Sequence, residues 1–236
     1  MTFPSLDWAR KPDFTYVGVD YAGPWYIKVS RQSQLQKVYV RLFTCCSTRA
    51  VHLELATDLS DDVFICCLSI FRVIRGLPEL ITSHNAKTFK AAAKTLSELF
   101  SYPTVKKFLA SKRIYRRFNE DRAPWWGGFS ERLIQNTKKR LRKTLRNARL
   151  NHDELHTVLV EVEETLNSRP LTYICLSSDD PEEPLTPSHL MYGRRILSPP
   201  EVTGYRKASV DHTVSSEDLA KRRKYLGLLL ENFWRR

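Results

Sequence analysis

The chain has 236 residues, long enough to bury a full core as one large domain. Its formal net charge of +12 favours a polyanionic partner, of which nucleic acid is the commonest. No apolar run approaches the roughly 18 residues of a membrane-spanning helix, and the N-terminal segment has no apolar signal region, so we expect neither a membrane protein nor a secreted one.

The first part of the chain is predicted to form three antiparallel strands. An irregular lead-in over residues 1–12 precedes alternating apolar residues at 14–21, and Gly23-Pro24 is predicted to end this first strand. Residues 36–46 and 50–56 continue the meander, with Val38, Val40 and Leu42 on one face of the second strand and Tyr39, Phe43 and Cys45 opposite.

A helix is expected next, because Asp58 or Ser60 can cap its start and Gly76 can stop it. Its buried face is predicted to contain Val63, Cys67, Ile70, Phe71 and Ile74. Further along the chain we expect a strand at 80–81, helices at 87–100 and 104–110, a strand at 113–118, a loop at 119–128, and helices at 129–149 and 151–168.

The two longest of these helices have clear apolar stripes. The stripe of the first is predicted to comprise Phe129, Leu133, Thr137, Leu141, Leu145 and Ala148, and that of the second Leu155, Val158, Leu159, Val162 and Leu166. Residues 13–170 would form the core domain, 171–212 an irregular Pro-containing extension, and 213–236 a C-terminal helix. This order of strands and helices predicts an α/β fold.

Three polar residues occupy positions that could meet at one edge of the sheet. Asp20 lies near the end of the first strand, His84 follows the strand at 80–81, and Glu131 lies near the start of the long helix. The carboxyl ends of neighbouring parallel strands form the usual ligand crevice of such sheets. Phosphodiester chemistry with two Mg²⁺ ions needs hard oxygen ligands held close together, which makes Asp20 and Glu131 candidate metal ligands.

The long helix is strongly basic. Glu131, Gln135, Lys138 and Arg142 share one of its faces, and Lys139 lies beside them. This arrangement places a carboxylate next to a track of cations suited to DNA phosphates. Taken singly, Asp20 could be a turn former, Glu131 could compensate the helix dipole, and the basic residues could be a solvated face. Their combination, in this order and with this net charge, favours nucleic-acid chemistry.

Several segments resemble the integrases of BEL/Pao LTR retrotransposons, a retroviral-type family. Residues 17–24 (VGVDYAGP) resemble the first motif of that family, and residues 124–133 (PWWGGFSERL) resemble the third. Residues 50–60 (AVHLELATDLS), 166–171 (LNSRPL) and 185–190 (LTPSHL) also look like this family, so the resemblance covers about residues 12–236.

The resemblance implies an RNase H-like core with a five-stranded mixed sheet flanked by helices and a mostly helical C-terminal extension. It implies a DDE polynucleotidyl transferase that uses Mg²⁺ or Mn²⁺ to process element DNA ends and join them to host DNA. Asp20 would then bind both metals and Glu131 one. The DNA-contacting residues would be Asn85, Lys87, Gln135, Lys138, Lys139 and Arg142.

The family also implies a homo-oligomer that acts in the nucleus after passage through the cytoplasm. Its zinc-binding N-terminal domain and its small C-terminal domain are expected to be missing from this chain. Five cysteines lack any zinc-site spacing and are expected to be reduced thiols.

The chain departs from the family at the second motif. The family reads Ser-Asp-Asn there, whereas this chain reads Ser83-His84-Asn85, so His84 occupies a catalytic aspartate position. A neutral imidazole supplies no negative charge and suits Mg²⁺ less well than a carboxylate. If the change costs about 4 kcal/mol of transition-state stabilisation, the rate falls roughly a thousandfold.

Two functional hypotheses follow. The chain is an integrase-type enzyme core impaired by His84, or it is a non-catalytic DNA-binding or scaffold protein derived from such a core. A histidine ligand that accepts Mn²⁺ is a chemically possible variant of the first hypothesis. A metabolic α/β enzyme is disfavoured because the chain has only 8 glycines and no Gly-rich phosphate-binding loop.

Overall fold

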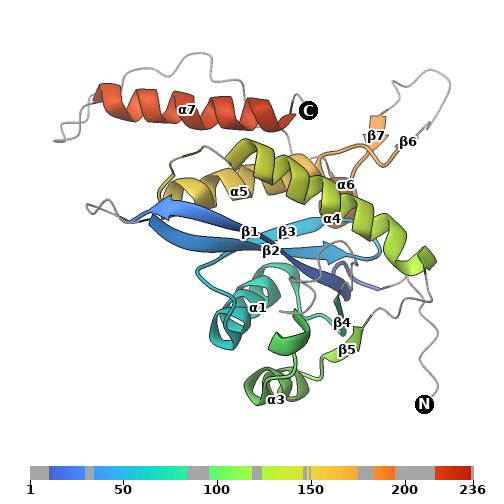
Figure 1. The fold of residues 1–236 in the computed structure, drawn as a ribbon. Helices are drawn as coiled ribbons and strands as arrows, with labels where there is room; N and C mark the ends of the chain where they lie inside the picture. The colour runs from blue at the N-terminus through green and yellow to red at the C-terminus, as the bar shows by residue number, and fades with distance from the viewer. Residues whose placement is uncertain are drawn as a thin grey trace.

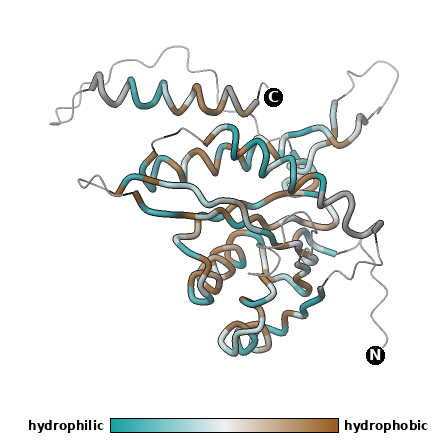
Figure 2. The backbone as a smooth tube through the Cα atoms, in the orientation of Figure 1, coloured by the Kyte–Doolittle hydropathy of each residue, from teal (hydrophilic) through white to brown (hydrophobic). Residues whose placement is uncertain are grey.

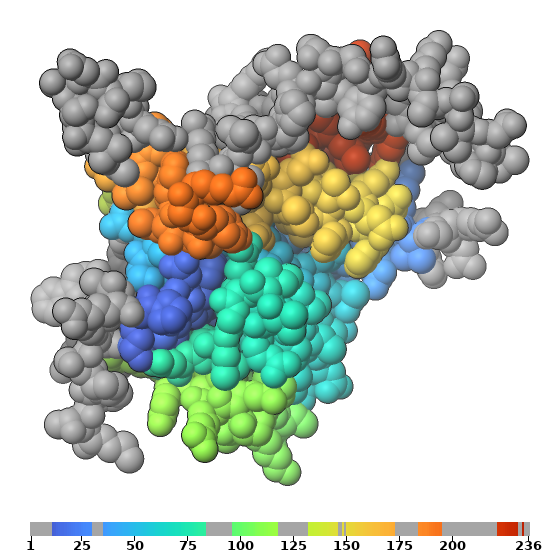
Figure 3. Space-filling model, turned by 180° about the vertical axis from the view of Figure 1, so that it is seen from behind, coloured from blue at the N-terminus to red at the C-terminus, as the bar shows by residue number. Residues whose placement is uncertain are grey.

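A five-stranded mixed sheet forms the centre of the molecule (Figure 1). The computed structural model describes residues 11–29, 35–83, 96–118, 124–145, 148, 150–174, 183–194 and 216–234. At 118, 124–131, 173–174, 183, 216–220, 231–232 and 234 it describes the backbone alone, and the residues with described side chains are coloured in Figure 3. The strands are β1 (Tyr16–Lys28), β2 (Leu35–Cys45), β3 (Val51–Ala56), β4 (Leu80–Ser83) and β5 (Tyr115–Phe118).

The strand order is β3-β2-β1-β4-β5. β1 and β2 pair antiparallel, as do β2 and β3, whereas β4 lies parallel to both β1 and β5. The predicted α/β fold with a five-stranded mixed sheet is therefore confirmed.

Helices cover both faces of the sheet (Figure 1). One face carries α4 (Pro124–Leu145), α5 (His152–Asn167) and α7 (Ser216–Trp234), and the other carries α1 (Asp61–Arg75) and α3 (Pro103–Ser111). Figure 2 shows hydrophilic and hydrophobic residues alternating along these helices, as expected for helices with one buried face. No helix in the described part of the chain is long and apolar enough to cross a membrane.

The sheet separates two apolar cores. Val38, Val40 and Leu42 point to the core beneath α4 and α5, and their neighbour Phe43 points to the core above α1. This alternation along β2 is the one predicted from the sequence. All five residues predicted to form the stripe of α5 are buried, and Asn151 caps this helix with a capping box that includes Glu154.

The first strand is longer than predicted. Gly23-Pro24 does not end β1: the register shifts between Ala22 and Trp25, and pairing with β2 then resumes at Trp25 and Val38. Proline has no backbone N–H to donate to the neighbouring strand, so the strand pairing is irregular at Pro24. The strand continues because Trp25 and Ile27 are buried in the core beyond it.

The predicted buried face of α1 is partly wrong. Ser60 caps the helix and Gly76 ends it, as expected, and Cys67 and Phe71 are buried. Ile70 and Ile74, however, are 46% and 55% exposed. The remaining buried positions are Phe64 and Leu68. The face with Phe64 and Phe71 is buried because its rings pack well against the sheet: Phe71 stacks on Phe43 at a centroid distance of 4.5 Å.

The long helix is shifted toward the N-terminus relative to the prediction. α4 begins at Pro124 and ends at Leu145, instead of spanning 129–149. Proline suits the first helical turn because its missing N–H would be unpaired there anyway. Ile134, absent from the predicted stripe, is buried with Leu141 and Leu145.

The region after α5 contains more regular structure than predicted. A hairpin of β6 (Thr172–Ile174) and β7 (Glu183–Leu185) is followed by α6 (Pro187–Tyr192), which Thr186 caps. The C-terminal helix was predicted and is present as α7. The helix predicted at 87–100 lies outside the described residues up to position 95, and Leu96 and Leu99 near its predicted end are buried.

Candidate active site

The end of β4 lies beside the first half of β1. Their parallel register ends at Val19 and Ser83, the residues that immediately precede Asp20 and His84 in the sequence. Asp20 itself still belongs to β1 and pairs with Leu42 of β2. The pairing of the two strands agrees with the sequence prediction, but Asp20 lies in the first half of β1 and not near its end, because the strand continues to Lys28. His84, and with it Asn85 and Lys87, lie outside the described residues.

Asp20 is buried and fully engaged. Its residue exposure is 6%. The backbone N–H of Tyr21 donates to its Oδ1 at 2.7 Å, and Lys138 Nζ lies 2.7 Å from its Oδ2. The carboxylate therefore has one backbone hydrogen bond and one ion pair, on opposite oxygens.

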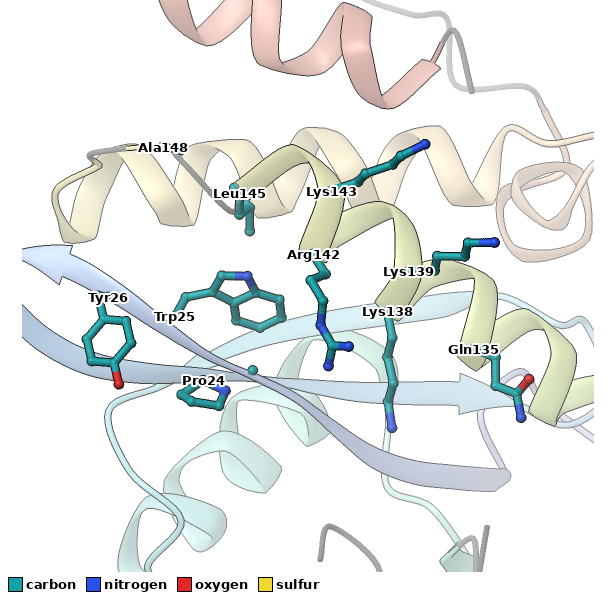
Figure 4. A pocket seen from close by; sticks show the side chains of 11 residues that line it. Pro24, Trp25, Tyr26, Gln135, Lys138, Lys139, Arg142, Lys143, Leu145 and Ala148 are labelled. Carbon is teal, nitrogen blue, oxygen red and sulfur yellow. The ribbon is translucent and has the colours of Figure 1, made fainter. Parts of the chain in front are cut away.

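Lys138 reaches Asp20 because of the way α4 crosses the sheet. Ile134, Leu141 and Leu145 pack on the β1–β2 face, and this contact turns Lys138 toward β1. Its side chain is 10% exposed. Figure 4 shows Lys138 and Arg142 extending from α4 toward β1, while Lys139 and Lys143 point away from the strand. Sequence reasoning placed Lys138 on the phosphate-binding track and gave no signal for its contact with Asp20.

Glu131 belongs to the same helix. It lies seven residues before Lys138, which corresponds to about 10 Å along the helix axis. Seven residues are close to two full turns, so the backbone presents both positions on the same side of α4. The side chain of Glu131 is outside the described part of the structure.

A groove lies between β1 and α4, beside Asp20. It has a volume of about 750 Å³. Four of the six residues predicted to contact DNA line it, and the full lining is Gly23, Pro24, Trp25, Tyr26, Gln135, Lys138, Lys139, Arg142, Lys143, Leu145 and Ala148. Every charged residue in this lining is basic. Lys143 was not among the predicted DNA contacts, although its position four residues after Lys139 places it on the same helix face.

The groove combines cations with aromatic surface. Trp25 forms its floor under α4, and its neighbour Tyr26 is 57% exposed (Figure 4). Lys139, Arg142 and Lys143 are exposed. Cationic side chains along a helix attract phosphates without reading sequence. The groove is therefore chemically suited to a nucleic-acid backbone.

A second polar cluster lies away from this groove and was not predicted. His52 of β3 is buried, with Nε2 2.8 Å from Glu54 and Nδ1 3.1 Å from Glu163 of α5. Glu163 also accepts the Leu53 backbone N–H at 2.7 Å and forms an ion pair with Arg75 of α1. The cluster therefore ties a sheet edge to helices on both of its faces.

The charges of this cluster change the pKa values of its members. Burial alone would lower the pKa of His52, but its hydrogen bonds to Glu163 and Glu54 outweigh burial and raise the pKa above its usual value. Burial alone would raise the pKa of Glu163, but its contacts with His52 and Arg75 lower the pKa below the usual value. The two carboxylates therefore favour the charged form of His52.

No protein-family model and no curated protein sequence matches the chain. Solved structures do match. The chain is similar to one from the simian T-cell lymphotropic virus intasome, with a TM-score of 0.51 and 15% identity over 84% of this chain and 61% of that one. It is similar to the catalytic core domain of BIV integrase, with a TM-score of 0.50 and 12% identity over 76% of this chain and 95% of that one.

The HTLV-2 integrase catalytic core domain in complex with magnesium gives a TM-score of 0.46 and 13% identity, over 77% of this chain and 98% of that one. At such identities the similarity concerns the fold. The chain has the fold of retroviral integrase catalytic cores.

The described donor atoms do not make a divalent metal site. The part of the chain with described side chains contains no group of three or more His, Cys, Asp or Glu residues that could hold a metal ion. Asp20 offers the hard oxygen that Mg²⁺ prefers, but a lysine ammonium already lies against its Oδ2. His84 and the Glu131 carboxylate, the other predicted members of the site, are not among the described side chains.

Proposed function

We propose that this chain is an integrase-type core that binds DNA along the groove between β1 and α4. One observation carries the proposal: on a fold like that of integrase catalytic cores, a groove whose charged residues are all basic contains Lys138, the ion-pair partner of Asp20. By its resemblance to the family's first motif, Asp20 would be the first catalytic residue. Lys139, Arg142 and Lys143 would contact phosphates, and Gln135 would donate a neutral hydrogen bond near the Asp20 end.

We propose that the ancestral chemistry is DNA end processing and strand transfer with Mg²⁺ or Mn²⁺, and that His84 impairs it. Asp20 and Glu131 would be the retained members of the site. The second motif would lack one negative charge, because an imidazole stands where the family has a carboxylate. The expected loss in rate is roughly a thousandfold, as for a loss of about 4 kcal/mol.

A strand-transfer assay tests this proposal. The full chain, His84→Asp and the double variant Asp20→Asn/His84→Asp are compared with labelled element-end DNA in Mg²⁺ and in Mn²⁺. We expect weak joining by the unaltered chain, a large gain for His84→Asp, and loss of that gain in the double variant. Robust Mg²⁺-dependent joining by the unaltered chain would contradict impairment by His84.

The second candidate is a non-catalytic DNA-binding or scaffold protein derived from such a core. The ion pair between Asp20 and Lys138 favours it, because the carboxylate is already neutralised. In this case all three variants bind DNA in an electrophoretic mobility assay, and none of them joins DNA in either metal.

We further propose an origin in a BEL/Pao-type LTR retrotransposon, on the strength of the sequence motifs at 17–24 and 124–133. An element of this type acts on chromosomal DNA, so the nucleus, reached through the cytoplasm, is the proposed location.

We propose that the chain self-associates through α1. Ile70, Val73 and Ile74 are 46%, 77% and 55% exposed, and Leu77, just beyond the helix, is 47% exposed. Four large apolar residues in one stripe are characteristic of an interaction surface. Light scattering should give a lower mass for Val73→Asp than for the unaltered chain. The matched control Leu35→Asp, at an exposed apolar position outside α1, should keep the original mass; an unchanged mass for Val73→Asp would contradict the proposal.

A further inference from the structure

Asp20 and Lys138 form a short, buried ion pair. Lys138 Nζ and Asp20 Oδ2 are 2.7 Å apart, and the two side chains are 10% and 9% exposed. The other oxygen of Asp20 accepts the Tyr21 backbone N–H at 2.7 Å. Lys138 belongs to α4, whose apolar face is buried on the sheet, so the packing of this helix determines the position of the ammonium.

This ammonium lies where a divalent cation would have to bind. An Mg²⁺ ion at its usual distance of about 2.1 Å from Oδ2 would be no more than about 4.8 Å from Lys138 Nζ in the observed position. Two cations this close repel each other strongly in a site that is largely shielded from water. The ammonium in this position therefore lowers the affinity of Oδ2 for a metal ion.

The charges of the candidate site residues also indicate weak binding of divalent cations. A site with three carboxylates attracts divalent cations through its negative charge. Here the second position is a histidine, which is neutral when it ligates a metal, and Lys138 adds a positive charge next to Asp20. Both differences lower the attraction for a cation.

We infer that Lys138 is the resident counter-ion of Asp20 and competes with divalent cations for its carboxylate, so that this carboxylate is charge-compensated without a metal. The inference concerns the site of the proposed function and rests on its assignment of Asp20 as the first catalytic position. It does not depend on whether the chain joins DNA.

Mn²⁺ binding to the full chain tests the inference. Free Mn²⁺ is measured by electron paramagnetic resonance in titrations of the unaltered protein, Lys138→Met, and the matched control Lys139→Met, which removes the same charge from the next residue of α4. We expect Lys138→Met to bind Mn²⁺ at least about tenfold more tightly than the unaltered protein, because a cation adjacent to the ligand oxygen is gone. Lys139→Met should change the affinity by no more than about twofold, because its side chain points away from β1.

A further variant ties the gain to Asp20. Asp20→Asn/Lys138→Met should lose the tighter Mn²⁺ binding. In thermal melts, Mn²⁺ should raise the melting temperature of Lys138→Met more than that of the unaltered chain. If Lys138→Met does not fold, Lys138→Gln removes the charge and keeps a hydrogen-bond donor, and it must show the same gain.

The inference is overturned if the unaltered protein and the Lys138 variant bind Mn²⁺ equally, or if Lys139→Met gives the same gain. These outcomes are independent of strand transfer. A failed rescue by His84→Asp together with tighter Mn²⁺ binding by Lys138→Met would refute the catalytic proposal and leave the counter-ion in place.

Discussion

Lys139 and Lys143 provide a direct test of the DNA-binding groove. Both are exposed on α4, one turn apart, and both line the groove while pointing away from β1 (Figure 4). The perturbation is the double variant Lys139→Gln/Lys143→Gln. The matched control is Lys106→Gln/Lys107→Gln, which removes the same charge from exposed positions of α3 on the opposite face of the sheet.

The expected magnitude follows from counterion release. Each phosphate contact contributes about 0.9 to the slope of log affinity against log salt for duplex DNA, so losing two contacts should reduce the slope by about 1.8. Between 50 and 200 mM salt, this difference means that the affinity of the unaltered chain falls about 12-fold more than that of the variant. Fluorescence anisotropy with a labelled duplex at several salt concentrations measures both slopes.

The control separates local contacts from net charge. The α3 variant should keep a slope within a few tenths of the unaltered value, because surface charges beyond about 10 Å are largely screened at 0.1 M salt. Equal slopes for the unaltered chain and the α4 variant would refute the groove as a phosphate-binding surface. An equal reduction in both variants would assign binding to overall charge instead.

Three further predictions concern the folded core. Glu163→Ala should lower the free energy of unfolding by about 3–5 kcal/mol, because Arg75 and His52 both lose their contact with this buried carboxylate. A thermal melt should show a melting temperature lower by about 6–20 °C, and a decrease below about 2 °C would contradict the structure. The pKa of His52 is raised by folding, so its stabilising contribution is complete below pH 6.5, the usual pKa, and is lost as the pH rises through the higher folded value. Urea midpoints should therefore decrease above pH 6.5 for the unaltered chain and less steeply for His52→Gln, and parallel curves would exclude this role. Asn167→Ala should lower the free energy of unfolding measured in urea by about 2–6 kcal/mol, because the Asn167 side chain accepts from the N–H of Val51 at 2.7 Å and donates to its C=O at 2.8 Å. The control Ser47→Ala, on the turn between β2 and β3, should lower it much less.

Periodic apolar patterns predicted most of the fold. The alternation in β2 and the stripe of α5 each have one clear apolar face, so burial can follow only one arrangement. α1 has two apolar stripes, and periodicity cannot choose between them. The choice is made by ring packing between Phe71 and Phe43, which lie far apart in the sequence.

The sequence predicted where the residues of the candidate site lie along the strands, but it did not predict the side-chain contacts between them. The parallel pairing of β1 with β4 ends at Val19 and Ser83, directly before Asp20 and His84 in the sequence. The ion pair between Asp20 and Lys138 depends on where α4 crosses β1, and that crossing is determined by Ile134, Leu141 and Leu145 together. No local pattern encodes such a crossing. His84 and Glu131 keep their sequence-based roles as predictions.

The early start of α4 has a geometric consequence for DNA. Because the helix is continuous from Pro124 to Leu145, Glu131 and Arg142 belong to one rigid rod. Eleven residues at 1.5 Å per residue separate them by about 16 Å, which equals roughly five base-pair steps of 3.4 Å. A duplex lying along this helix would therefore have one phosphate held at a set spacing from the backbone of Glu131, and a deletion of one residue between them would rotate the basic side chains by about 100° away from that carboxylate position.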